Sequence, residues 1–447
     1  MKKDTKLIKK NLNLKFSDRR DKYGFTVLKG SRVVRIIKKD NELFFKMYNQ
    51  KILKQMIDNE FILPFKIYES TKSDYIFVIQ NKIPIIVNPS EWSPAMFIDA
   101  AKLILRVERF LKDHNLTFDD VHPWNILFKD GKPFITDLGA FNFKNTSLHW
   151  DIKFKNKLWP CVTLYKAFFH NSIILMLSGK AAFVRQNFHN WYPFSNSDTF
   201  LILLKNPLLW FLYINNFLKE ILIEKSNIFL NKINLNISNL YYLNFNKFLI
   251  KIQKKLLKNI DEKKIISDEN YINNFIIKFI NKLNYGNLII FESEIVKKKE
   301  IKKKFGQRIL FLSENDKLID KLYKEYRGMY DLAVVDIRTP ATSSGPNNLW
   351  ISSMFDRFKC TNGIFYFDLE KIIIVKSLKI TELLDFVKLL AKEKKLLIFK
   401  KIKKLKYFND RDFGQTSDTL IIENVKLKFA NSKILKKSED ILIIEIN

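Results

Sequence analysis

The stretch Asp119-Asp-Val-His-Pro-Trp-Asn-Ile-Leu-Phe128, followed by Phe134-Ile-Thr-Asp-Leu-Gly139, carries the most informative pattern of the sequence. It contains a carboxylate, an amide and a second carboxylate in order, as Asp120, Asn125 and Asp137. Phosphoryl transfer uses these groups, because one carboxylate orients or deprotonates the acceptor while amide and carboxylate oxygens hold Mg²⁺ against the phosphates. We therefore expect Asp120 to act as a base and Asn125 and Asp137 to bind Mg²⁺.

The spacing from Asp120 to Asn125, with Pro123 two residues before the amide, resembles the catalytic loop of protein kinases and aminoglycoside phosphotransferases. Asp137-Leu-Gly139 then stands where those enzymes have Asp-Phe-Gly, beyond a hairpin that we expect to turn at Asp130-Gly131. The resemblance implies a kinase-like lobe with Mg-ATP as its cofactor. The alternative is a loop in which the same side chains serve only as caps and braces.

A kinase-like lobe also needs a basic residue on a strand and a carboxylate on the following helix. Lys46 lies in the apolar run Leu43-Phe-Phe-Lys, which we interpret as a strand, and Glu60 or Asp58 is its expected partner. The resemblance thus implies that Lys46 binds the phosphates of the nucleotide. A Gly-x-Gly-x-x-Gly loop that could cover the phosphates is not evident, because glycine is rare before residue 130.

Apolar periodicity separates an N-terminal segment, 1–141, from a middle segment, 142–283. The first mixes β-branched or aromatic runs with helical spacing; the expected strands are 32–37, 43–47 and 75–79, and the expected helices are 51–61 and 94–113. The middle segment has long aromatic-rich stretches without period-two alternation, so we expect a helical connector. Within it, 200–218 is interrupted by polar residues and predicts a buried or interfacial helix rather than a membrane span.

Residues 284–447 change to apolar runs of strand length separated by helix-like segments, which is typical of a parallel α/β sheet. The expected strands are 288–291, 308–312, 331–335 and 395–399, the expected helices are 316–326 and 380–394, and 425–429 with 441–446 form the expected terminal hairpin. We expect the strand 288–291 to lie in the centre of the sheet.

A second resemblance covers nearly the whole chain. It rests on Asp21-Lys-Tyr-Gly-Phe-Thr-Val-Leu28, on Ser90-Glu-Trp-Ser93, on the run from His114 to Phe128 and on Lys132-Pro-Phe-Ile-Thr-Asp137. These motifs are similar to those of a group of bacterial class I methyltransferases that carry a kinase-like N-terminal lobe and are sometimes described as nodulation-protein-like. The resemblance implies a Rossmann-type methyltransferase-like domain at the C-terminal end.

Methyltransferases of this class hold S-adenosylmethionine at the carboxyl ends of a parallel sheet, and an acid after the second strand binds the ribose hydroxyls. The resemblance therefore implies that Glu314 contacts the ribose and that Asp336, in Val335-Asp-Ile-Arg-Thr-Pro340, lies beside the adenine or the methyl donor. Glu292 and Glu294 occupy the turn where the family has small glycines. We expect these two acids to weaken cofactor binding unless a basic residue offsets them.

Length and composition bound the remaining questions. A chain of 447 residues and 53.3 kDa predicts about three domains, and we expect 1–141 to be a kinase-like lobe, 142–283 a helical connector and 284–447 a divergent methyltransferase-like domain. The net charge of +31 does not exclude nucleic acid, although a composition rich in lysine throughout is the favoured explanation. Two cysteines and the lack of a visible targeting segment favour the cytoplasm, and we expect no transmembrane segment.

The leading functional prediction is a divergent S-adenosylmethionine-dependent methyltransferase-like protein with an unknown acceptor, such as a small molecule or a glycan. One alternative is an ATP-dependent small-molecule kinase that uses the kinase-like fold. The other is a catalytically inactive binding protein, which the missing glycines favour.

Overall fold

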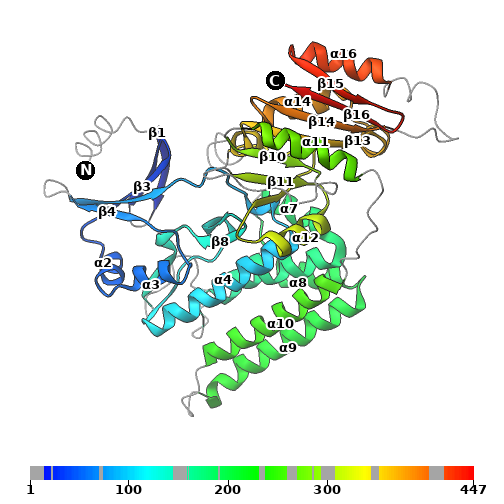
Figure 1. The fold of residues 1–447 in the computed structure, drawn as a ribbon. Helices are drawn as coiled ribbons and strands as arrows, with labels where there is room; N and C mark the ends of the chain where they lie inside the picture. Colours follow the sequence, from blue (N-terminus) through cyan, green and yellow to red (C-terminus); the bar gives the residue numbers. More distant parts are fainter. Residues whose placement is uncertain are drawn as a thin grey trace. The chain divides into compact units, whose positions relative to one another are not determined.

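The computed structural model describes residues 15–21, 24–69, 74–143, 159, 161–189, 192–230, 237–258, 269–283, 286–292, 308–343, 352–401 and 417–447. It is a mixed α/β multi-domain fold with several sheets (Figure 1). The chain divides into two compact units, a first unit built mainly from Met1–Asn259 and a second unit that contains Ile260–Ser344 and Ile351–Asn447.

The first unit begins with a five-stranded antiparallel sheet in the order β1-β2-β3-β5-β4. Alternating side chains of the third strand point into a small core, where Val34 and Ile36 are buried against Val27. The strands are β1 (Lys15–Asp21), β2 (Gly24–Lys29), β3 (Arg32–Lys38), β4 (Lys66–Glu69) and β5 (Tyr75–Asn81). The predictions of strands at 32–37 and 75–79 are confirmed.

The segment 43–47, which we predicted as a strand, is helical and forms part of α2 (Glu42–Asn49). The side chain of Asn41 caps this helix by accepting a hydrogen bond from the Phe44 amide at 2.9 Å. Leu43, Phe44 and Met47 are buried at a spacing of three to four residues, which suits a helix face better than a strand. The next helix, α3 (Ile52–Asp58), lies within the predicted helix 51–61.

The predicted helix 94–113 is α4 (Pro94–Asp113), and the chain then makes short paired strands. These are β6 (Leu116–Phe118) with β9 (Phe141–Phe143), and β7 (Ile126–Lys129) with β8 (Lys132–Ile135). Asp130 and Gly131 join β7 to β8 with φ angles of 51° and 73°. Two positive φ angles in a two-residue loop define the hairpin turn expected at this point.

The described part of the middle segment is helical, as predicted. Its elements are α5 (Val162–Tyr165), π-helical turns at Lys166–His170 and Met176–Lys180, α6 (Asn171–Leu175), α7 (Ala181–His189), α8 (Asn196–Leu203), α9 (Pro207–Leu230) and α10 (Ile237–Lys258). Helix α10 contacts both α4 and α9 (Figure 1). By length and composition alone, the helical run Val162–His189 is the one described stretch that could cross a membrane, and just over half of its most apolar window is buried.

The second unit contains a seven-stranded sheet in the order β12-β11-β10-β13-β14-β16-β15. The first five strands of that order are parallel and follow the doubly wound order 3-2-1-4-5, whereas the last two form an antiparallel hairpin. The strands are β10 (Leu288–Phe291), β11 (Ile309–Ser313), β12 (Asp331–Val334), β13 (Asn362–Asp368), β14 (Lys395–Lys400), β15 (Ser432–Lys437) and β16 (Ile441–Ile446). The prediction that 288–291 lies inside the sheet is confirmed.

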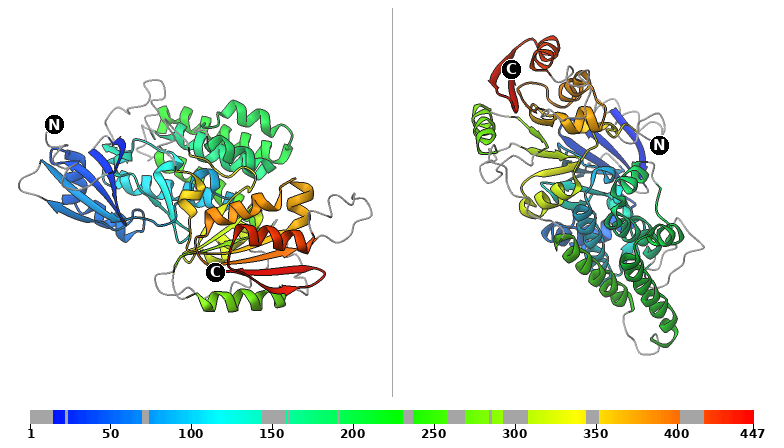
Figure 2. Two further views of the ribbon diagram at one scale, coloured as in Figure 1. Left: turned by 90° about the horizontal axis from the view of Figure 1, so that it is seen from above. Right: turned by 90° about the vertical axis from the view of Figure 1, so that its right-hand side faces the viewer.

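Helices cover both faces of this sheet, with α11 (Glu269–Lys282) on one face and α14 (Ile380–Leu390) and α16 (Asp418–Lys428) on the other (Figure 2). The remaining helices are α12 (Asp316–Tyr326), α13 (Met354–Phe358) and a π-helical segment at Glu370–Val375. Every described β10 and β11 residue is buried, as expected for strands covered on both faces.

The predicted strand at 425–429 is wrong, because most of this segment belongs to α16. The hydroxyl of Ser417 caps the helix by accepting a hydrogen bond from the Leu420 amide at 3.3 Å, and Ile421 and Val425, four residues apart, bury one face. The terminal hairpin is instead formed by β15 and β16. The helices of the expected connector are divided between the units, since α5–α10 precede Asn259 and α11 follows it, and the three-part division stays a prediction.

Candidate functional site

In the first unit, two turns that carry the predicted catalytic residues are joined by backbone hydrogen bonds. The Asp119 amide donates to the Ala140 carbonyl at 2.7 Å, and the Thr136 amide donates to the Asn125 carbonyl at 2.8 Å. These bonds make the loop that contains Asp120 and Asn125 a direct neighbour of the turn that contains Asp137. The structure therefore brings three of the predicted residues into one region.

Each of the three residues has a specific partner. His122 Nε2 lies 3.0 Å from Asp120 Oδ2, and the buried Asn125 side chain donates from Nδ2 to the Asp120 carbonyl at 3.3 Å. Asp137 Oδ1 accepts a hydrogen bond from the Gly139 amide at 2.9 Å and lies 2.8 Å from Arg35 Nη1.

The strand cation of this lobe is Arg35, which the sequence did not single out. It lies on β3 between the buried Val34 and Ile36, so its side chain points away from the small core. Besides its contact with Asp137, its guanidinium donates to the Thr136 carbonyl. The sequence pattern that could have identified Arg35 is a charged residue placed between two β-branched residues, Val34 and Ile36, because this alternation is typical of a strand with one polar face.

Lys46 does not have the predicted position on a strand. It lies on α2, where its ammonium is 4.8 Å from the centroid of the Phe143 ring. Its expected partner Glu60 instead pairs with Lys132 at 3.0 Å, in an exposed ion pair, and Asp58 is the last residue of α3. Lys46 and either carboxylate therefore do not form the predicted pair.

A buried carboxyl group forms hydrogen bonds with β6, which directly precedes the loop that contains Asp120. Glu108 on α4 accepts hydrogen bonds from Thr117 Oγ1 at 2.8 Å and from the Phe118 amide at 3.0 Å. Burial raises the pKa of Glu108 to about 7, although Lys112, 3.7 Å away, lowers it. Burial also raises the pKa of Cys161, whose thiol donates to the Phe118 carbonyl, so this thiol is a structural group and not a nucleophile.

The residues present do not fit a magnesium–nucleotide site. Both predicted carboxylates already contact a side chain that carries or can carry positive charge, Asp137 with Arg35 and Asp120 with His122. The sequence between the segments of β1 and β2 contains no Gly-x-Gly-x-x-Gly pattern that could cover the phosphates, because Lys22 and Tyr23 are followed by a single glycine, Gly24. Across the described part of the chain, no three or more His, Cys, Asp or Glu side chains are grouped to hold a metal ion.

In the second unit, charged residues gather where the parallel strands end. Glu292 follows β10 directly and has φ of 56°, the left-handed conformation that favours glycine. Its carboxylate accepts hydrogen bonds from Ser313 Oγ at 3.1 Å and from the Glu314 amide at 2.8 Å. Glu292 thus keeps the backbone conformation of a glycine turn while its side chain reaches the end of the neighbouring strand.

Glu314 follows β11 and connects two further strand ends. Its Oε1 accepts a hydrogen bond from the Ile337 amide at 2.8 Å, beyond β12, and its Oε2 forms an ion pair with Lys376. Lys376 follows β13 and its π-helical segment, so the pair spans the carboxyl end of β10, which lies between β11 and β13 in the sheet. Burial lowers the pKa of Lys376, and the charge of Glu292 opposes this shift.

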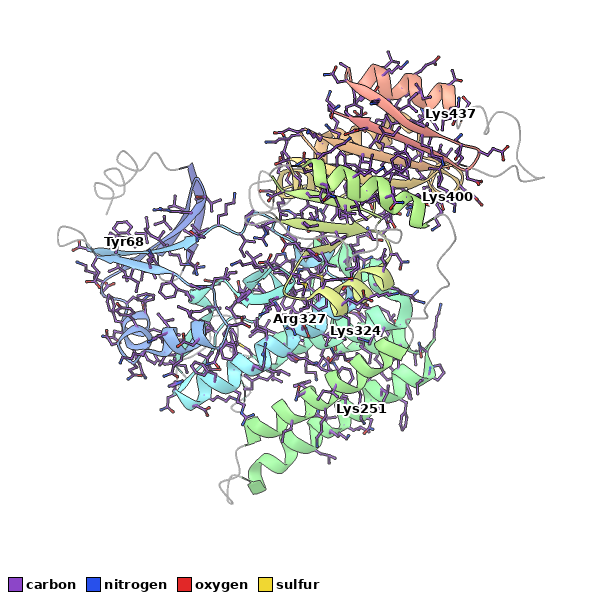
Figure 3. All side chains as sticks on the ribbon, viewed as in Figure 1. Tyr68, Lys251, Lys324, Arg327, Lys400 and Lys437 are labelled. Carbon is purple, nitrogen blue, oxygen red and sulfur yellow. The ribbon has the colours of Figure 1, made fainter. Side chains whose placement is uncertain are left out.

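Asp336 lies near Glu314, but its carboxylate forms its contacts with Arg338 in the same turn. Its Oδ1 accepts a hydrogen bond from the Arg338 amide at 2.9 Å, and its Oδ2 lies 3.2 Å from Arg338 Nη2. Burial alone would raise the pKa of Asp336, but these hydrogen bonds outweigh burial and hold it below its ordinary value. Further along the sheet, Asp368 at the end of β13 pairs with Lys400 at 2.9 Å, a residue labelled in Figure 3.

The structure therefore brings Glu314 and Asp336 to adjacent strand ends, and their contacts with the ribose and with the adenine or methyl donor stay predictions. It adds Lys376, which the sequence analysis missed because lysine is common throughout the chain. Glu294 lies outside the described residues.

No family model and no curated protein sequence matches this chain. Solved structures that resemble parts of it include the PH0226 protein from Pyrococcus horikoshii OT3 (12% identity, TM-score 0.30, 42% of this chain and 93% of that chain). EvdMO1 (11% identity, TM-score 0.28, 44% of this chain and 46% of that chain) and vaccinia related kinase 3 (16% identity, TM-score 0.20, 29% of this chain and 48% of that chain) are also similar. Similarities this weak carry no conclusion about fold or function.

Proposed function

We propose that the second unit binds S-adenosylmethionine at the carboxyl ends of β10, β11 and β13 and that the protein is a divergent methyltransferase-like protein. The observation that carries the proposal is the group of Glu292, Glu314 and Lys376 at this edge. In doubly wound sheets, ligands bind outside the carboxyl ends of the strands, where the strand order reverses. Here that reversal falls between β10 and β13.

The chemistry of the three side chains matches the ligand group by group. An acid about 20 residues beyond the first turn is the usual partner of the ribose hydroxyls, and Glu314 follows Glu292 by 22 positions (314 minus 292). Lys376 offers a cation for the ligand's carboxylate, and Glu292 offers an anion for its ammonium group. Lys376 also places a basic residue close enough to Glu292 for their charges to interact, and the sequence analysis required such a residue to offset an acid at this turn.

When bound, S-adenosylmethionine supplies an activated methyl group, and the chain's own residues bind and orient the ligand. The internal hydrogen bonds of Glu292 and Glu314 fix these carboxylates before the ligand arrives, which lowers the entropic cost of binding. The acceptor in this proposal is a small molecule or a glycan. If the protein binds the ligand without turnover, it is the inactive binding protein of the alternative prediction.

Calorimetry with S-adenosylhomocysteine on the full-length protein tests this proposal. We expect micromolar binding, about −8 kcal/mol, and at least a tenfold loss in Glu314→Gln and in Lys376→Met because each removes one charge partner. Glu325→Gln, an exposed change on α12, is the matched control. Wild-type protein that fails to bind at millimolar ligand would refute the proposal, whereas binding without methyl transfer to any acceptor class would leave only the binding-protein alternative.

A further inference from the structure

We propose that Arg35 replaces a divalent cation as the counter-charge of Asp137, so that the kinase-like lobe of the first unit keeps its form without magnesium and does not bind a magnesium–nucleotide. This inference concerns the first unit and does not depend on ligand binding in the second unit. It rests on three observations: the ion pair itself, the other donors to Asp137, and the partner of Asp120.

The ion pair is enclosed and charge-assisted. Arg35 Nη1 lies 2.8 Å from Asp137 Oδ1, and the two side chains are only 13% and 32% exposed. A guanidinium stays charged at every physiological pH, and its planar fork loses little freedom when it forms several hydrogen bonds. Because the same guanidinium also donates to the Thr136 carbonyl, Arg35 is held by two groups of one turn.

The carboxylate oxygen that faces Arg35 has no room for a metal bond. Asp137 Oδ1 accepts from Gly139 N at 2.9 Å as well as from Arg35, and a carboxylate oxygen offers about two lone-pair sites. Magnesium would need one of these sites and would also approach a fixed positive charge. Both effects oppose coordination at Asp137 Oδ1, and a metal ion bound through Oδ2 would still approach the fixed positive charge of Arg35.

The second expected carboxylate does not compensate. Asp120 Oδ2 lies 3.0 Å from His122 Nε2, and the side-chain Nδ2 of Asn125 donates to the backbone carbonyl of Asp120. Magnesium sites use one or two carboxylates together with substrate phosphates. Both carboxylates have partners within the chain, and no glycine-rich loop precedes β2. These polar contacts therefore hold β3 and the two turns together without a bound ligand.

The test is a titration of the full-length protein with Mn²⁺, followed by electron paramagnetic resonance of the free ion, and with Mg-ATP, followed by tryptophan fluorescence. We expect wild-type protein and Asp137→Asn to give the same curves, with no site at millimolar metal that depends on Asp137. In Arg35→Gln we expect a new Mn²⁺ site that is lost again in Arg35→Gln/Asp137→Asn. Arg32→Gln, an exposed change on the same strand, should behave like wild type.

A wild-type Mn²⁺ or Mg-ATP site that disappears in Asp137→Asn overturns the proposal. A folded Arg35→Gln protein that gains no metal site also overturns it, because Arg35 would then not be the group that excludes the metal. If Arg35→Gln does not fold, the comparison of wild type with Asp137→Asn decides alone: equal titrations support the proposal and different ones reject it.

Discussion

Replacing Glu108 by Gln should change how the stability of the first unit depends on pH. Glu108 is fully enclosed beneath the loop that contains Asp120, and burial raises its pKa to about 7 from an ordinary value of 4.5. The charged form is thus disfavoured in the folded protein. Glutamine has the same shape, cannot ionise, and can still accept a hydrogen bond from the Phe118 amide.

The sign and the size follow from linkage. Below pH 4.5 the carboxyl group of Glu108 is protonated in both the folded and the unfolded state, so its ionisation does not affect stability. Between pH 4.5 and 7 this group loses its proton in the unfolded chain but keeps it in the folded protein, so the free energy of unfolding falls as pH rises. A shift of this size corresponds to about 3 kcal/mol, taking about 1.4 kcal/mol for each pH unit. The free energy of unfolding of Glu108→Gln minus that of wild type should therefore increase by about 3 kcal/mol from pH 4 to pH 8.

Urea unfolding followed by tryptophan fluorescence measures this difference in the intact chain. Every tryptophan except Trp350 lies within Met1–Asn259, so the signal reports on the first unit. Asp113→Asn, an exposed change at the end of the same helix, is the control and should show no comparable trend. A difference between Glu108→Gln and wild type that stays constant from pH 4 to pH 8 would show that Glu108 ionises normally and would refute the reasoning.

Three further predictions concern single buried sites. Burial lowers the pKa of His170 to about 3, so stability should fall as pH drops from about 6.5 towards 3, and His170→Phe should flatten this limb in the same urea assay. Arg308→Met leaves the Asp331 carboxylate, which is 1% exposed, without its two-bond partner at 2.9 Å; circular dichroism should show a loss of about 3–5 kcal/mol, and an unchanged unfolding midpoint would contradict this. Gly363→Ala adds a methyl group 2.9 Å from the Ala391 side chain and should cost about 1–3 kcal/mol by the same measurement.

Four of the five parallel strands, β10, β11, β12 and β14, could be predicted from the sequence because they are buried on both faces, whereas β13 was not expected. Continuous apolar runs of four residues, such as Leu288–Phe291 and 396–399 within β14, have few alternative structures when turns and helices separate them. The hairpin at Asp130-Gly131 was equally well specified, because few dipeptides accept two positive φ angles.

Short amphipathic segments could not be assigned reliably. The runs 43–47 and 425–429 contain apolar residues in both strand-like and helix-like positions, and a capping residue just before each helix, Asn41 and Ser417, decides the outcome. The error at 43–47 also explains why Lys46 was expected at the wrong site. Cytoplasmic location stays a prediction from the sequence, and the positive charge still does not exclude contact with nucleic acid.

Two cations, Arg35 and Lys376, were missed in the sequence, and each of them contacts a carboxylate far away in the chain. Arg35 and Asp137 are 102 residues apart, and Glu314 and Lys376 belong to different strand connections. No local spacing marks such a pair, and lysine is too frequent here to stand out. Only the topology, which makes the ends of β11 and β13 neighbours of β10, brings the second pair together.

The two ion pairs differ in what can replace them. A ligand with a diol, a carboxylate and an ammonium group brings partners of both signs, so it can separate Glu314 from Lys376 and satisfy each of them. Burial lowers the pKa of Lys376, so its charge is poorly solvated and needs an anionic partner, which the carboxylate of the ligand can supply in place of Glu314. A metal ion brings positive charge only, so at Asp137 it can replace Arg35 but leaves the guanidinium half-buried beside a second cation. Under our two proposals, an internal ion pair is therefore compatible with ligand binding in the second unit and opposes metal binding in the first.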